Sequence, residues 1–124
     1  MTTQARVWTN EAGRFEISHQ GNATLIAVTG DLDISNVGQF ETALEHALSS
    51  HQQTVIASLA QASYFDSIGI HSLLRFAERL ATTRRRFVIV SPHGSTSRRV
   101  LEISGMAASY PVFESIDDAL TSLG

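Results

Sequence analysis

Two adjacent polar residues, Asp66 and Ser67, stand where a predicted strand meets a predicted helix, and they are the strongest candidates for chemistry in this chain. Residues 54–59 form an apolar run typical of a buried strand, and apolar residues recur with helical spacing from Ile70 to Ala81. The serine hydroxyl therefore lies at the start of a helix, where backbone N–H groups are free and the helix dipole is positive. Such a position tolerates a phosphate. A serine phosphorylated there would act as a switch and not as a catalyst.

Each residue of this segment also has a purely structural interpretation. Ser67 could cap the helix by accepting a hydrogen bond from a free backbone N–H, which is worth about 1 kcal/mol. Asp66 could complement the positive end of the helix dipole, or it could position Ser67 and contact a kinase or its metal. Gly69 could let the start of the helix approach a strand closely. Asp33 could be a turn residue that precedes a helix.

Other catalytic and cofactor-binding patterns are missing from the sequence. There is no cysteine, so the chain has neither a thiolate nucleophile nor a cysteine metal site. His71 follows Ser67 by one helical turn, but Ser67 does not lie in a Gly-x-Ser-x-Gly elbow. The histidines lack the paired spacing of metal ligands, and they are His19, His46, His51, His71 and His93. With no phosphate-binding glycine motif either, the sequence predicts no catalytic residue, no metal and no cofactor.

The elements that must position Asp66 and Ser67 alternate between strands and helices. Strands are predicted at 14–18 and 24–29, joined as a hairpin by the turn Gly21-Asn22, and again at 54–59, 87–90 and 112–113. Helices are predicted after Ser35 or Asn36, over 68–83, from a Ser95 cap to Gly105, and over 116–123. The predicted fold class is α/β, with a mixed, mostly parallel sheet of four to five strands and about four helices. We expect residues 1–13 to be a flexible arm and 14–124 to be one domain.

Length and charge restrict the class of protein. A chain of 124 residues that is 43% hydrophobic can form one domain with one core. The net charge of −3 does not favour nucleic-acid binding, and the basic run Arg84–Arg86 reads as the solvated end of a helix. The apolar runs are too short to span a membrane, and the first residues lack the apolar stretch of a signal peptide. We therefore expect a cytoplasmic protein.

Three short motifs, in this order along the chain, resemble those of the STAS domain of bacterial anti-sigma factor antagonists. Gly30-Asp31-Leu32-Asp33 matches a motif at the end of an early strand of that family. Asp66-Ser67-Ile68-Gly69-Ile70 matches the family's switch motif, in which the serine after the aspartate is phosphorylated. Arg99, followed by Ser104-Gly105-Met106, matches a third motif. The resemblance covers roughly residues 14–123 and implies the STAS fold.

Two positions depart from the family pattern. Ile68 replaces the second hydroxyl residue of the switch, and Ser58 replaces the Asp or Asn that is usual on the central strand. The first change removes a neighbour that could tune phosphorylation or partner contact. The second could alter how the loops near the switch are held.

The resemblance implies a partner-switching function for this chain. The unphosphorylated protein would bind an anti-sigma factor that is also an ATP-dependent serine kinase, phosphorylation of Ser67 would end the complex, and a phosphatase would reset it. We expect partner contacts at the sheet end where the segments Gly30–Asn36, Asp66–Ile70 and Pro92–Ser97 meet. The residues expected to bind the partner are Asp31, Asp33, Asp66, Ser67, Ile68, Gly69, Ser95 and Arg99.

Two other classes of function remain open at this point. One is a structural STAS subunit of a transporter or stress-signalling complex without a phosphorylation cycle; such subunits tend to carry Thr at the switch, whereas this chain has Ser67. The other is a small enzyme, which the missing acid–base and metal patterns disfavour.

Overall fold

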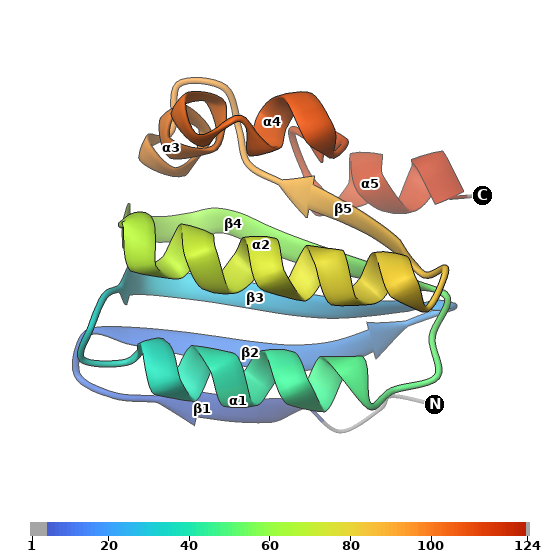
Figure 1. Cartoon of the computed structure of the whole chain (residues 1–124), viewed down its shortest axis with the longest axis horizontal. Helices are drawn as coiled ribbons and strands as arrows, with labels where there is room; N and C mark the ends of the chain where they lie inside the picture. Colours follow the sequence, from blue (N-terminus) through green and yellow to red (C-terminus); the bar gives the residue numbers. More distant parts are fainter. Residues whose placement is uncertain (1–4, 124) are drawn as a thin grey trace.

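Six strands form one mixed sheet in the computed structural model, which describes residues 5–123 (Figure 1). The strands lie side by side in chain order; the first two pairings are antiparallel, and the remaining three are parallel. Their bounds are Arg6–Thr9 (β1), Gly13–Gln20 (β2), Ala23–Leu32 (β3), Thr54–Phe65 (β4), Arg86–Val90 (β5) and Val112–Phe113 (β6). The mixed sheet with its helices confirms the predicted α/β class. The hairpin at Gly21-Asn22 is also confirmed, because Gln20 pairs with Ala23.

Five helices are present in the described part of the chain, one more than the sequence pattern indicates. Their bounds are Val37–Leu48 (α1), Ser67–Thr82 (α2), Thr96–Ser104 (α3), Met106–Ser109 (α4) and Ile116–Leu123 (α5). The additional helix, α4, is a single turn that follows Gly105. Gly105 ends α3 in the left-handed conformation with φ at 87°, which is the glycine role expected at a helix C-terminus. No helix within residues 5–123 is long and apolar enough to cross a membrane.

The strand β1, which the sequence pattern did not predict, corrects the expectation of a flexible arm over residues 1–13. Arg6 to Thr9 pair with Ile17 to Arg14 and so extend the sheet by β1. Trp8 packs against the core, with its ring 5.6 Å from that of His46 on α1. The packing of Trp8 offsets the conformational entropy lost when a four-residue edge strand becomes ordered. The residues of this segment alone do not reveal that packing. The expectation for residues 1–4 falls outside the described residues.

Alternation along the strands divides the core into two layers. Ile26, Val55 and Ala57 face α1 and α2, whereas Leu25 and Ile56 face α5. Figure 1 shows α1 and α2 next to each other across one face of the sheet, with α3 beside the end of α2 at which that helix begins. The first face holds the larger cluster of buried side chains.

Candidate phosphorylation and partner-binding site

The carboxyl ends of β3 and β4 lie side by side, because Leu32 pairs with Phe65. Both strands run further than the sequence pattern indicates, since β3 continues beyond Gly30 to Leu32 and β4 continues to Phe65. Two register shifts in this ladder, after Ala27 and after Gly30, each add one residue to β4. Without both shifts Leu32 would face Ser63. The irregular strand thus aligns the two loops that follow β3 and β4, as bulges near functional sites do.

Gly69 brings the first turn of α2 onto these strand ends. A Cβ atom at Gly69 would lie 2.7 Å from Leu32 Cδ2 and 2.9 Å from Phe65 Cε2, closer than real side chains approach. Leu32 and Phe65 are both buried, so their side chains have little room to move away from an added Cβ atom. The expectation that a glycine permits close packing here is confirmed, and Gly69 itself is buried.

Asp66 caps α2. Its Oδ1 accepts hydrogen bonds from the backbone N–H groups of Ile68, at 3.1 Å, and Gly69, at 3.3 Å. These are two of the donors that a helix N-terminus leaves without partners. Asp66 therefore has the structural role that the sequence allowed for Ser67.

Ser67 is the first residue of α2 and is exposed. Among residues 5–123 its hydroxyl has no hydrogen-bond partner, so the interpretation of Ser67 as the capping residue is wrong. The hydroxyl is open to solvent, and Ile68 beside it is half-buried. His71, one turn later, is exposed and forms no hydrogen bond with Ser67, so this hydroxyl lacks the activating base that a nucleophile needs.

The loop between β3 and α1 lies at the same end of the sheet as the start of α2 (Figure 1). The Asp33 carboxylate accepts hydrogen bonds from the backbone N–H of Ser35, at 2.9 Å, and from its hydroxyl, at 2.6 Å. This is the aspartate turn expected before a helix. The next residue, Ile34, is 73% exposed.

Asp31 lies in β3 and not in the loop, and it pairs with Tyr64 on β4. Because neighbouring residues of a strand point to opposite faces, the side chains of Asp31 and Tyr64 point away from α1 and α2. Tyr64 is 49% exposed. The sequence pattern missed Tyr64 and Ile34 as surface residues; in the sequence Ile34 directly follows Asp33, and Tyr64 precedes Asp66 by two residues.

The segment Pro92–Ser97 is set apart from the other two. β5 pairs with β4 only as far as Val90 opposite Ser58, and Ser97 Oγ lies 3.3 Å from the carbonyl oxygen of Leu59. Because both register shifts lie between Ser58 and Phe65, the stretch from Leu59 to Phe65 spans only about four residue spacings of β3, or about 13 Å at the usual rise per residue. The structure therefore brings together Gly30–Asn36 and Asp66–Ile70, but it places Ser95 farther back along β4.

Ser95 and Arg99 have different surroundings within α3. Ser95 caps the helix by accepting the N–H of Arg98 at 3.1 Å, and it donates to the carbonyl of Pro92 at 2.7 Å. Arg99 is exposed, whereas Arg98 reaches the carbonyl oxygen of Ser91 at 2.9 Å. The arginine that holds this region is thus Arg98, whereas Arg99 lies on the surface of α3.

Glu114 joins the loop before α5 to the loop before α3. It accepts the backbone N–H of His93 at 3.0 Å and forms ion pairs with the His93 ring and with Arg98. The hydrogen bond from the His93 backbone, aided by the charges of His93 and Arg98, lowers the pKa of the Glu114 carboxyl below its ordinary value. These contacts hold the Pro92–Ser97 segment in place against the loop before α5.

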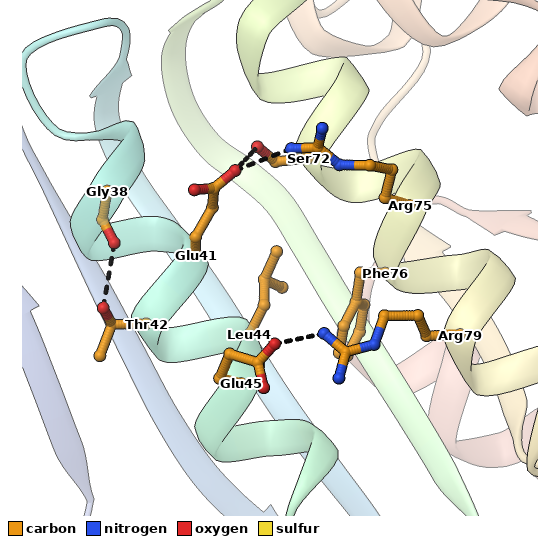
Figure 2. A pocket seen from close by; sticks show the side chains of 9 residues that line it. All are labelled: Gly38, Glu41, Thr42, Leu44, Glu45, Ser72, Arg75, Phe76 and Arg79. Atoms are coloured by element: carbon orange, nitrogen blue, oxygen red, sulfur yellow. Dashed lines mark hydrogen bonds and ion pairs between the residues drawn. The ribbon is translucent and has the colours of Figure 1, made fainter.

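A hollow of about 460 Å³ lies between α1 and α2 (Figure 2). Two ion pairs cross it, Glu41 with Arg75 and Glu45 with Arg79, and Ser72 donates to Glu41 at 2.8 Å. The charged groups in this hollow already pair with one another from one helix to the other. In the part of the chain that the structure describes, no three His, Asp or Glu side chains gather as metal ligands would.

The model of the STAS domain matches residues 14–119, which is most of the chain. This chain belongs to the STAS domain family. The match includes both loops that flank Leu32 and Phe65, and it confirms the family that the motifs indicate. The β1 strand lies outside the matched residues.

Known proteins similar to this STAS domain include regulators of sigma factors. The anti-sigma-F factor antagonist RsfB of Mycobacterium tuberculosis is 23% identical over 105 residues, which cover 85% of this chain and 84% of RsfB. A crystal structure of an anti-sigma factor antagonist from Mycobacterium paratuberculosis aligns with a TM-score of 0.79 at 19% identity, covering 96% of this chain and 93% of that one. The phosphorylated form of the Bacillus cell fate determinant SpoIIAA aligns with a TM-score of 0.69 at 21% identity, covering 89% and 99%. These structures share the fold of this STAS domain.

Proposed function

We propose that this STAS domain is an anti-sigma factor antagonist that binds an anti-sigma factor through the surface around Ser67 and is released when Ser67 is phosphorylated. The observation that carries the proposal is the environment of Ser67, an exposed hydroxyl without a described partner at the start of a helix whose cap is supplied by Asp66. Such a hydroxyl can enter a kinase active site without any change in the fold.

The similar proteins support the same function. RsfB is named an anti-sigma-F factor antagonist, and it aligns with this chain over most of both lengths. SpoIIAA is known in a phosphorylated and in an unphosphorylated form. A cycle of phosphorylation fits the switch motif of this chain, with an anti-sigma factor as the serine kinase and a phosphatase that resets Ser67. Such partners act in the cytoplasm, where we place this protein.

The surface for the anti-sigma factor combines apolar and acidic side chains. Ile34 and Tyr64 are exposed, and Ile68 in the first turn of α2 is half-buried. Asp33 and Asp66 add carboxylates to the same end of the sheet. A partner with an apolar patch and basic residues at its margin would complement this surface.

Phosphorylation acts on this surface through charge and volume. Because Asp66 already occupies the N–H groups of Ile68 and Gly69, a phosphate on Ser67 would stay at the surface. It would add roughly −1.5 to −2 charges at neutral pH beside the two carboxylates. The helix dipole tolerates this charge within the fold, whereas a partner fitted to the unmodified surface meets repulsion and a steric block.

The contribution of the outlying residues differs. Arg99 is exposed on α3 and extends the binding surface at its margin, while Ser95 acts by capping α3. Asp31 contributes from the sheet face that it shares with Tyr64. We propose that the domain acts by being bound and modified, without catalysis of its own.

Phosphorylation mapping and a binding series test this function together. The protein is used to capture its partner from its native cells, the captured anti-sigma factor is purified, and the two are incubated with ATP before mass spectrometry. We expect phosphate on Ser67. In calorimetry, Ser67→Ala should keep the affinity of the wild type, whereas Ser67→Glu should weaken it at least tenfold. Phosphate solely on another residue, or equal affinities for the two variants, would contradict the proposal.

A further inference from the structure

Asn36 is a buried amide that holds the loop between β3 and α1. It stands at the N-cap position of α1, yet its side chain makes no capping hydrogen bond to that helix. Its Oδ1 accepts the backbone N–H of Asp33 at 3.0 Å, and its Nδ2 donates to the carbonyl oxygen of Asp31 at 2.8 Å. Asn36 is only 1% exposed, so these groups depend on the amide and not on water for their partners.

Asn10 makes the matching connection from the turn between β1 and β2. Its Oδ1 accepts the backbone N–H groups of Ala12, at 2.9 Å, and Gly13, at 3.0 Å, and so closes that turn. The same oxygen accepts a hydrogen bond from Asn36 Nδ2 at 3.2 Å. Asn10 Nδ2 donates to the hydroxyl of Ser35 at 3.2 Å. The two asparagines therefore join the turn and the loop at two points.

The backbones of the turn and the loop are also in direct contact. The N–H of Asp31 donates to the carbonyl oxygen of Ala12 at 2.9 Å. A Cβ atom at Gly13 would lie 2.2 Å from the carbonyl oxygen of Asp31 and 3.1 Å from Asn36 Nδ2. Only a glycine permits this approach. The turn between β1 and β2 thus packs directly against the start of the loop between β3 and α1.

The supported loop carries part of the proposed partner surface. Ser35, which accepts from Asn10, itself holds the carboxylate of Asp33 at 2.6 Å. Between them Ile34 stands in solvent. A continuous chain of hydrogen bonds therefore runs from the turn between β1 and β2 to the acidic and apolar groups of the surface beside Ser67.

We propose that Asn10 is a positioning residue that fixes the β3–α1 loop, so that the β1–β2 hairpin takes part in partner recognition without contacting the partner. The role in recognition rests on the function proposed above. The role in fixing the loop does not, and it can be measured on the protein alone.

Amide hydrogen exchange followed by NMR tests the first step. In Asn10→Ala the backbone amides of Asp33 and Ser35 should exchange at least tenfold faster than in the wild type, whereas the amide of Ala57 in the central strand should change less than twofold. The matched control is Asn22→Ala, the same chemical change in the turn at the opposite end of β2, where Asn22 is exposed and has no described side-chain hydrogen bond. This control should leave the amides of Asp33 and Ser35 unchanged.

Ser35→Ala provides a second variant that does not put the β1–β2 turn at risk. Ser35 is exposed, and its hydroxyl is the link between Asn10 and the Asp33 carboxylate. We expect a smaller increase in exchange at Asp33, about threefold. The affinity of each variant for the captured anti-sigma factor is then measured; Asn10→Ala should weaken it at least fivefold, mainly through faster dissociation, and Asn22→Ala should not.

The outcomes separate this inference from the proposed function. Unchanged exchange at Asp33 and Ser35 in both variants overturns the inference, whatever the binding data show. Faster exchange with unchanged affinity also overturns it, because the loop would then be held for stability alone. If the wild type binds no anti-sigma factor, the proposed function fails, while the exchange rates still confirm or overturn the role of Asn10 in fixing the loop.

Discussion

Replacing Asp66 with alanine should destabilise the domain more than replacing its neighbour Ser67 with alanine. The Asp66 carboxylate accepts two backbone N–H groups of the first turn of α2, at 3.1 and 3.3 Å. Removing a helix cap of this kind costs about 1 kcal/mol, within a range of about 0.5 to 2. For a domain of this size that free energy lowers the melting temperature by about 3 to 5 °C. Ser67 caps nothing in the described structure, so Ser67→Ala should stay within about 0.5 kcal/mol of the wild type.

Urea unfolding followed by circular dichroism measures these differences. Asp66→Asn is the matched variant, because asparagine caps helices about as well as aspartate and removes only the charge. It should therefore retain nearly all of the wild-type stability. A loss in Ser67→Ala equal to that in Asp66→Ala would show that the serine and not the aspartate caps α2, and the assignment of a free hydroxyl at Ser67 would fall with it.

Three further perturbations test other parts of the structure. Ile34→Ala should weaken binding of the captured anti-sigma factor several-fold without a loss of stability, since Ile34 is 73% exposed. Arg84→Ala, just beyond the opposite end of α2, should leave the affinity measured by calorimetry unchanged, and the reverse pattern would mean that the partner binds another face. Gly69→Ala should lower the free energy of unfolding in urea, because overpacking against Leu32 costs about 1 to 3 kcal/mol and helix propensity returns less than about 1; a stabilised variant would contradict the close contact. Burial, aided by the charges of Arg6 and His19, lowers the pKa of His46 below 6.5, so the stability that the neutral His46 ring contributes is present above pH 6.5 and is lost as pH falls. The wild type should therefore lose more free energy of unfolding than His46→Gln between pH 7.5 and 5.5, and an equal loss would refute the lowered pKa.

Local signals predicted much of the fold. The helical spacing from Ile70 onward identified α2, the turn Gly21-Asn22 identified the hairpin, and Gly105 ended α3 as expected. These features depend on residues close in the chain, whose periodicity and backbone preferences are visible without the rest of the molecule. The order of the elements then restricted the sheet to a mixed, mostly parallel arrangement.

Long-range pairing decided the features that the sequence pattern missed. The edge strand at Arg6–Thr9 is ordered by its pairing with β2 and by the packing of Trp8 against α1. The two register shifts in β4 appear only against β3, and they align Leu32 with Phe65. β-strand pairing is set by partners distant in sequence, so its extent cannot be read from the strand alone.

The candidate site divides in the same way. The sequence by itself determined that Asp66, Ser67 and Gly69 stand at a helix start, because capping residues and helical periodicity act over a few positions. Only the tertiary structure decided that Asp66 makes the cap and leaves the Ser67 hydroxyl without a partner among the described residues. It further decided that β5 leaves β4 at Ser58, several residues before β4 ends at Phe65. It also decided that Asn10 supports the loop beside Ser67, since a hydrogen bond between residues 26 positions apart arises only when the sheet brings two turns together.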